Sequence, residues 1–114
     1  MKLITKEQRK QMLDNGCLRM TDPRFDPVPV VKLYALFSDA TWLLSSISPL
    51  NPDMAFGLCD LGMGEPEIGW VALSELAKLK ILGCCPQVER EKFFKGKAPL
   101  SVYAEKAYKS GRIV

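Results

Sequence analysis

Polar and apolar positions near the start of the chain predict a helix. Residues 6–14 have the sequence KEQRKQMLD, which is rich in strong helix formers. Thr5 and Gln8 form a capping-box signature, in which the two side chains bond to backbone N–H groups of the first turn. Asn15 and Gly16 follow, and such a pair favours the left-handed residue at which many helices end. We therefore expect the first helix to end at Asn15-Gly16.

The middle of the chain predicts strands. Four short segments are rich in β-branched and aromatic residues, and turns containing Pro, Gly, Asp or Ser separate them. Pro29 places the start of the first strand at an edge or an entry bend. Short strands joined by short turns predict an antiparallel meander. The four predicted strands are residues 28–37, 40–47, 54–61 and 68–73.

Two more helices and a weaker strand pattern follow. Ser74 can cap a short helix over SELAKLKIL, and Gly83 would end it. The segment VEREKFF, residues 88–94, alternates loosely between charged and apolar positions, and its lysines suit an edge strand. Pro99 and Ser101 precede a last helix, VYAEKAYKS, which Gly111 stops.

Length and composition agree with one small globular domain. The 114 residues are 47% hydrophobic and 25% charged, which is ordinary for a soluble fold. A chain of this size buries roughly two-thirds of its unfolded surface and needs no disulfide or metal to fold. We expect a single α+β domain, residues 1–114, with an antiparallel β-meander of three to five strands flanked by N-terminal, middle and C-terminal helices.

The chain contains no histidine. This excludes Ser-His-Asp and Cys-His catalysis and His-ligated zinc. Its cysteines lack the CxxC spacing of structural zinc sites, and buried thiols are the expectation. The N-terminus has no apolar run of signal-peptide length, and the longest uncharged run, residues 40–52, is too short to span a bilayer. We expect a cytoplasmic protein with reduced cysteines, no cofactor, no metal and no membrane contact; the cysteines are Cys17, Cys59, Cys84 and Cys85.

The stretch FGLCDLGMGEPEIGW, residues 56–70, contains four glycines and three carboxylates. A phosphate-binding loop should open a helix, but here a Glu-Pro-Glu segment and then a strand follow. Gly62 and Gly64 are expected to supply positive φ angles in a hairpin loop. The carboxylates match no calcium-loop pattern, so the stretch predicts a turn with an acidic surface.

Charge is divided sharply along the chain. Residues 33–77 contain six acidic and no basic residues, whereas the flanking segments, 1–32 and 78–114, carry net charges of +3 and +6. The acidic segment can attract the basic elements within the fold, or it can form a docking face for a basic partner. The candidate partner-binding residues on this acidic sheet-and-turn surface are Asp60, Glu65, Glu67 and Glu75.

Aromatic residues offer a second kind of candidate. Trp42 and Trp70 fall in separate predicted strands and are expected to pack in the core or to form a cross-strand pair, whereas exposure of either would indicate a binding surface. Phe93 and Phe94 lie within a basic segment where lysines could neutralise phosphates and aromatic rings could stack on bases. The candidate nucleic-acid-binding residues are Arg90, Lys92, Lys95 and Lys97, although an edge strand with solubilising lysines explains them equally well.

Three segments of the chain resemble a known family, and their sequences are DPVPVVKLY, ATWLLSSISPLNPDMAFGLCDLGMGEPEIGWVALSEL and PLSVYAE. They resemble the small bacterial and phage proteins catalogued as domain of unknown function 2958, from the LITKEQR opening to the last helix. The most specific part is AFGLCDLGMGEPEIGWVALSEL. The resemblance implies an accessory role in a plasmid, integrative element or phage, and it carries over no catalytic site.

The leading hypothesis is therefore a non-enzymatic accessory or interaction protein of a mobile genetic element or phage. It would bind a protein partner through the acidic sheet-and-turn surface, and counter-defence is one version of that role. The first alternative is a nucleic-acid-binding accessory factor that uses the basic C-terminal segment. The second is a small enzyme that uses Asp60 and Glu67 as a carboxylate pair.

Overall fold

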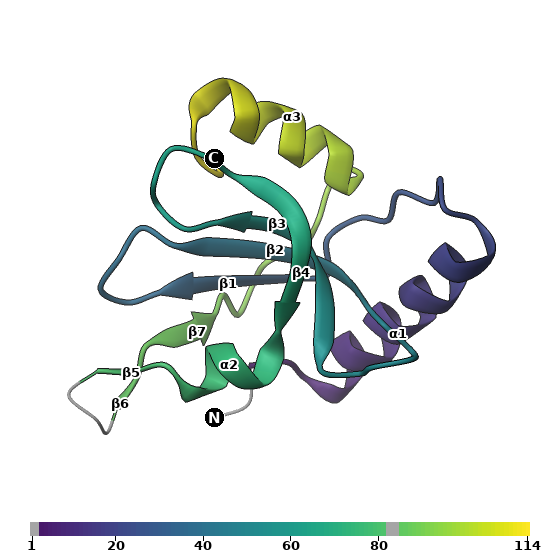
Figure 1. Ribbon diagram of the computed structural model, residues 1–114, viewed down its shortest axis with the longest axis horizontal. Coiled ribbons are helices and arrows are strands. Elements are labelled where there is room, and N and C mark those ends of the chain that lie inside the picture. Colours follow the sequence, from purple (N-terminus) through teal and green to yellow (C-terminus); the bar gives the residue numbers. More distant parts are fainter. Residues whose placement is uncertain (1–2, 82–84) are drawn as a thin grey trace.

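A five-stranded antiparallel sheet forms the centre of the fold, with strand order β4-β3-β2-β1-β7 (Figure 1). The computed structural model describes residues 3–81 and 85–114. Strands β1 to β4 follow one another along the chain, and β7 returns to pair with β1, so the predicted meander is confirmed. The five strands are β1 (Val31–Ala35), β2 (Thr41–Ile47), β3 (Met54–Asp60), β4 (Glu67–Ala72) and β7 (Val88–Arg90).

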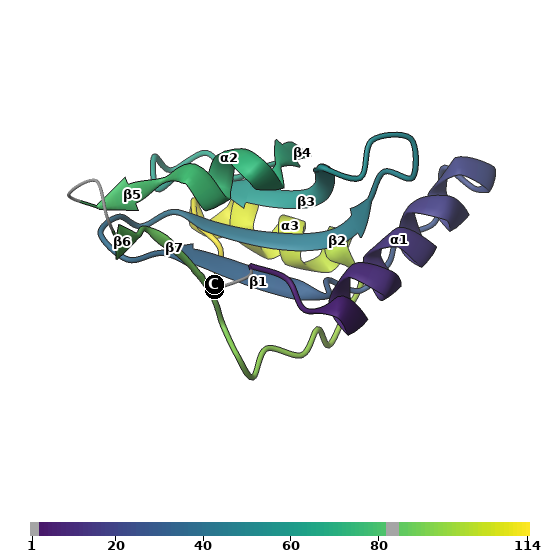
Figure 2. The same ribbon diagram turned by 90° about the horizontal axis from the view of Figure 1, so that it is seen from below.

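Three helices flank this sheet, as the sequence predicts. They are α1 (Lys6–Thr21), α2 (Leu73–Lys78) and α3 (Leu100–Ser110). A small hairpin of β5 (Lys80–Ile81) and β6 (Cys85–Pro86) follows α2. Figure 2 shows α1 lying across one end of the sheet, beside β2. None of the helices among the described residues is long and apolar enough to cross a bilayer.

The central strand β2 is buried on both faces, because each face of the sheet has its own helical cover. Neighbouring residues of a strand point to opposite faces, so Leu43 and Leu44 join different clusters. The cluster beneath α1 and α2 includes Met12, Leu33, Leu44, Leu73 and Leu76. The cluster beneath α3 includes Leu43, Leu58, Leu100, Ala104 and Ala107.

Helix α1 does not end at Asn15-Gly16, so that prediction is wrong. The capping box of Thr5 and Gln8 is confirmed, but the helix continues to Thr21. Asn15 instead donates its side-chain amide to the Ser45 carbonyl at 2.8 Å. A Cβ at Gly16 would lie 1.9 Å from a backbone oxygen of β2, so glycine there permits close helix–sheet packing. Tertiary contacts therefore override the local stop signal.

Helix α2 is shorter than expected and has a different cap. It begins at Leu73 and ends at Lys78, and the predicted terminator Gly83 lies outside the described residues. Ser74 lies inside the first turn and does not occupy the cap position. Its backbone N–H and hydroxyl both donate to the carboxylate of Asp53, at 2.9 and 2.6 Å. A residue from the β2–β3 loop thus supplies the cap.

Helix α3 begins with the same device and ends as predicted. The backbone N–H of Ser101 donates to the carboxylate of Asp26 at 3.1 Å, and its hydroxyl donates to the same carboxylate. Gly111 follows the helix in the left-handed conformation, with φ of 74°. The predicted last strand is confirmed only over Val88–Arg90, and residues 91–99 form an irregular connection to α3.

Candidate functional site

Asp60 lies inside the fold, at the C-terminal end of β3. Only 2% of the residue is exposed. One carboxylate oxygen accepts the Gly62 N–H at 2.8 Å, and the other accepts the Ile113 N–H at 2.9 Å. Asp60 therefore ties the β3–β4 loop to the C-terminal segment. A carboxylate held in this way is not presented at the surface, either to a partner or as half of a catalytic pair with Glu67.

The glycine-rich stretch forms the predicted turn. Gly62 and Gly64 have φ angles of 80° and 83°, which confirms the expected left-handed conformation. This loop, the β1–β2 turn and the start of the C-terminal segment enclose a polar cavity of about 440 Å³. Asp39 and Arg112 line it, but its buried carboxylate, Asp60, is already satisfied by backbone donors.

The structure brings together only two of the four acidic candidates. Glu65 and Glu67 are both exposed, at the loop end of β4. Glu75 is exposed in α2, beyond the opposite end of the strand. A six-residue strand with a rise of about 3.3 Å per residue separates its two ends by roughly 16 Å. The exposed acids therefore flank β4 at both ends and form no single patch.

Strand β4 itself is the unusual feature of this region. It occupies an edge of the sheet, and none of its six residues is buried. Ile68 is 38% exposed and Trp70 is 50% exposed, whereas Trp42 is only 4% exposed. Trp70 therefore departs from the expected core packing. No local sequence signal shows this departure, because it depends on the strand order that places β4 at an edge.

Trp70 belongs to a row of side chains across three strands. Ser46, Phe56 and Trp70 are register neighbours on β2, β3 and β4. The rings of Phe56 and Trp70 meet edge to face, with centroids 5.0 Å apart. The guanidinium carbon of Arg19, from α1, lies 3.8 Å from the centroid of the Phe56 ring. This cation–π contact adds to the packing that holds the Trp70 ring in place.

A pocket of about 290 Å³ lies beside this row. Met20 and Leu50 line it and are 57% and 82% exposed, so its rim is largely apolar, although Arg19 also lines it. Ser46 also lines it and is fully buried, and its hydroxyl is the one buried side-chain polar atom without a hydrogen-bond partner among the described residues. A buried hydroxyl without a partner is costly, and this one lies in the wall of the pocket.

The basic candidates lie on the opposite edge of the sheet and in the connection that follows it. Arg90 is partly buried in β7 and is not a free cation. Lys92, Lys95 and Lys97 are exposed. Phe93 is 93% exposed between them, whereas Phe94 packs against the cluster beneath α3. The connection therefore presents one uncovered aromatic ring among three lysines.

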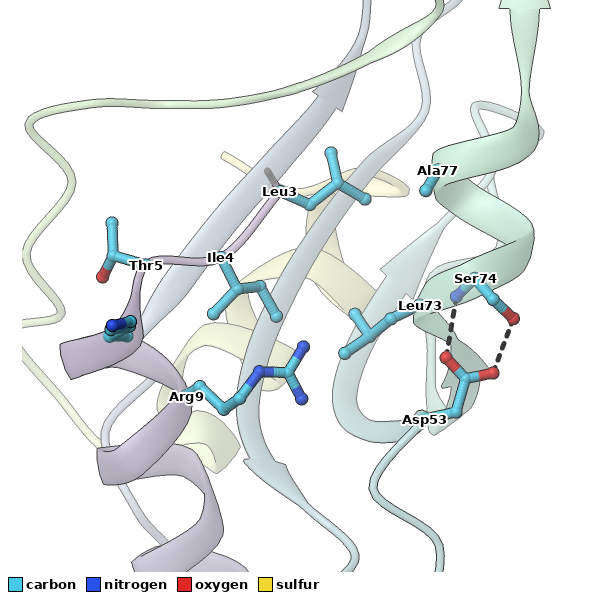
Figure 3. Close-up of a pocket in the computed structure, with 9 residues that line it drawn as sticks. Leu3, Ile4, Thr5, Arg9, Asp53, Leu73, Ser74 and Ala77 are labelled. Atoms are coloured by element: carbon cyan, nitrogen blue, oxygen red, sulfur yellow. Dashed lines mark hydrogen bonds between the residues drawn. The ribbon is translucent and has the colours of Figure 1, made fainter. Parts of the chain in front are cut away.

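A groove of about 620 Å³ separates the start of α1 from α2 (Figure 3). Leu3, Ile4 and Leu73 give it an apolar floor, and the Arg9 side chain extends into it. Asp53 lies on the far side, where hydrogen bonds from Ser74 hold the pKa of its carboxyl below the usual value. Because Asp53 is engaged with α2, the groove combines two exposed cations, Lys6 and Arg9, with apolar walls, and its described lining residues include no catalytic pair.

Two cysteine side chains, those of Cys17 and Cys59, are described, and neither lies in a metal-binding cluster. Cys17 is exposed on α1, and burial raises the pKa of the Cys59 thiol to about 11. A thiol with that pKa is protonated at neutral pH and is a poor nucleophile or metal ligand. Cys84 lies outside the described residues. Within residues 3–81 and 85–114, no group of three or more Cys, Asp or Glu side chains is arranged to hold a metal ion.

Comparison with known proteins gives a family and no function. No curated protein and no solved structure matches the chain. One family model, described as a protein of unknown function (DUF2958), matches residues 3–114, which is nearly the whole chain. The chain therefore belongs to the DUF2958 family.

Proposed function

We propose that this protein is a non-enzymatic interaction protein of a mobile genetic element or phage that binds a protein partner in the cytoplasm. The binding surface is the acidic sheet-and-turn region, with Glu65, Glu67 and Glu75 as its exposed acids. Asp60 holds this region together from inside and does not contact the partner. Masking a basic pocket of a nuclease, as a counter-defence protein would, is one role that such a surface suits.

One observation carries this proposal: an uncovered edge strand with a half-exposed tryptophan stands between the acids. Exposed tryptophans are enriched among the residues that dominate protein–protein binding energy. Charged rims around such a residue steer a complementary partner and set specificity. Residues 33–77, which include β4 and the three acids, contain no basic residue that would neutralise these acids within the segment. These features together favour a basic protein partner.

Charge reversal tests the proposal. The tagged chain is used to capture proteins from a nuclease-treated bacterial lysate, and bound proteins are identified by mass spectrometry. The paired change Glu65→Lys and Glu67→Lys should abolish capture while the melting temperature stays close to that of the wild type. The paired change Glu7→Lys and Asp14→Lys is the matched control, because both residues are exposed acids on α1. Equal capture by the Glu65/Glu67 variant would contradict the proposal.

A second candidate function is nucleic-acid binding by the basic connection. The observation that favours it is the 93% exposed ring of Phe93 among Lys92, Lys95 and Lys97. Aromatic rings stack on unpaired bases, and lysines neutralise the phosphates alongside. Glu91 reduces the local charge and forms an ion pair with Lys32, with 3.7 Å between the charged atoms. The acidic edge of the sheet therefore remains the first proposal.

Binding of a fluorescent oligothymidylate tests this second candidate. Affinity should fall steeply with salt, and Phe93→Ala should weaken binding by roughly 1–3 kcal/mol, the usual contribution of one stacked base. Lys106→Ala, which removes an exposed lysine of α3, is the control and should leave affinity nearly unchanged. Absence of binding at low salt would rule this function out.

A further inference from the structure

The two edges of the sheet are protected to different degrees. β7 is only three residues long, and charged residues follow it directly. β4 is six residues long and contains one charged residue, Glu67, with no lysine and no proline. Natural edge strands are usually short, charged or covered, because their unpaired backbone groups can pair with another strand. Apart from its ladder with β3, no backbone hydrogen bond of residues 67–71 occurs among the described residues.

Neither packing within the fold nor backbone conformation requires a glycine at position 69, in the middle of β4. Its register neighbour Gly57 is required by packing, since a Cβ there would lie 2.0 Å from the Leu43 carbonyl oxygen. A Cβ at Gly69 would meet no atom within 4 Å, and only Gly62, Gly64 and Gly111 adopt positive φ among the described glycines. Glycine inside a strand is typical of a place that a ligand or another backbone approaches closely.

The charges around β4 select the kind of strand that could pair with it. Glu65 and Glu67 lie at one end, and Glu75 lies beyond the other. If a second copy paired antiparallel, the Glu67 end of one strand would face the Glu75 end of the other, and a parallel copy would align the same acids. Like charges across a strand pair are destabilising. A second copy is therefore disfavoured, and a strand with basic residues near both ends is favoured.

The pocket beside Trp70 provides a place for a side chain of such a strand. Its volume of about 290 Å³ is at the lower limit for small-molecule sites, so it suits one side chain better than a whole ligand. Its exposed rim residues, Met20 and Leu50, are apolar. In strand addition, backbone pairing supplies affinity, and pockets for alternate side chains supply specificity. An apolar side chain is the complement that this rim requires.

We propose that β4 accepts an added strand from a basic, extended segment of the partner, with one apolar side chain of that segment in the pocket beside Trp70. This inference rests on the proposed protein-binding function and specifies how binding occurs. Backbone groups of β4 pair with the segment, the acids at the two ends of β4 meet its basic residues, and the space above Gly69 admits a side chain that crosses the edge.

The test uses the full chain and a blocked peptide, KVKVLVKVK, as the probe at low salt. Amide hydrogen exchange of residues 67–72 should slow by about tenfold or more when the peptide binds, because added pairing protects edge amides. Two control peptides are EVEVLVEVE, which reverses the charges, and KVKVLVKVK with N-methyl groups at alternate backbone nitrogens, which cannot pair. Neither control should bind.

Two variants locate the site. Trp70→Ser should weaken peptide binding about tenfold or more, as the loss of an aromatic anchor does. Gly69→Val should also weaken it, while the folded chain keeps or gains stability, since the added side chain meets nothing in the fold and valine favours strands. Both variants are checked for an unchanged fold by circular dichroism before binding is compared.

The outcomes separate this inference from the proposed function. Absence of binding, equal binding by the N-methylated peptide, or protection outside β4 would overturn strand addition. Each of those results is compatible with partner capture that depends on Glu65 and Glu67, which would leave the proposed function standing. Slowed exchange confined to residues 67–72, without any captured protein in the lysate, would support strand addition at β4 and count against the proposed cellular function.

Discussion

The side-chain amide of Asn15 donates a 2.8 Å hydrogen bond to the backbone carbonyl of Ser45. Asn15 is 4% exposed, and Ser45 occupies the irregularity at which the β2–β3 register shifts. Gln11 donates to the Asn15 oxygen at 3.0 Å and so fixes the orientation of the amide. A buried polar contact thus joins α1 to the β2 bulge, close to the pocket proposed as the anchor site.

We predict that Asn15→Ala destabilises the fold. The Ser45 carbonyl would remain buried without its partner, which costs about 1–3 kcal/mol. Urea unfolding measures the effect. Asn15→Asp is the sharper variant, because it nearly preserves shape but removes the donor and points a carboxylate at a carbonyl oxygen. If both variants unfold at the wild-type urea concentration, this contact does not join the helix to the sheet.

Gly16→Ala should also destabilise the protein, although alanine is the better helix former. The propensity gain is about 1 kcal/mol. The added Cβ would lie 1.9 Å from the Ile47 carbonyl oxygen, so α1 must move away from β2. Overpacking of this kind costs about 1–3 kcal/mol or more. Gly69→Ala provides the control, since its Cβ meets nothing and its melting temperature should not fall. A rise in melting temperature for Gly16→Ala would contradict the close approach.

Asp60→Asn should loosen the C-terminal segment. The carboxylate accepts two backbone N–H groups, from Gly62 and Ile113, and an asparagine side chain has only one oxygen to offer. The lost acceptor leaves a donor unsatisfied, at a cost of about 1–3 kcal/mol. Hydrogen exchange at Ile113 or Gly62 should accelerate. Asp39→Asn changes an exposed acid of the same polar cavity and should alter neither stability nor exchange.

The contact between Asp53 and Ser74 predicts a stability difference that depends on pH. The side-chain hydrogen bond from Ser74, followed by the backbone one, lowers the pKa of Asp53 in the folded state. A lowered pKa stabilises the fold above the unfolded value, near 3.9, and this stabilisation is lost as pH falls through the folded pKa. Ser74→Ala should therefore melt below the wild type at pH 7, and the gap should narrow below about pH 4. A gap independent of pH would exclude this linkage.

Local sequence signals predicted much of the fold, since their causes lie within a few residues. The Thr5–Gln8 capping box depends on neighbouring backbone groups, and Gly111 ends α3 because glycine tolerates positive φ. The alternation of apolar segments and short turns is sufficient to predict the four-strand meander. These features hold in the structure with small shifts at strand ends.

The errors arose where a distant residue decides the outcome. Asn15 and Gly16 carry a local stop signal, but contacts with β2 continue the helix. Serine is a common helix-capping residue, which is why Ser74 is predicted as the cap. In the structure, the carboxylate of Asp53, from the β2–β3 loop, accepts the hydrogen bonds at the start of α2. The burial of Asp60 depends on the Ile113 N–H, 53 residues further along the chain. No local pattern contains these partners.

The candidate site was predictable only in part. Charge distribution along the chain indicated an acidic sheet-and-turn surface, but it could not show that Glu67 and Glu75 lie at opposite ends of one strand. Exposure of Trp70 follows from the position of β4 at the sheet edge, which is a property of strand order. The pocket beside Trp70 is lined by Met20 of α1 and Leu50 of a later loop, and only folding brings these two residues together.

Site-specific photocrosslinking in bacterial cells shows most directly whether β4 is the surface that contacts the partner. A photoreactive phenylalanine analogue replaces Ile68 on β4 in one variant and Phe93 in the basic connection in another. Both side chains are exposed, so each variant can react with whatever lies against it. We expect a protein adduct at position 68 that survives nuclease treatment, and little adduct at position 93. An adduct only at position 93 that nuclease removes would contradict this expectation and identify the basic connection as the functional surface.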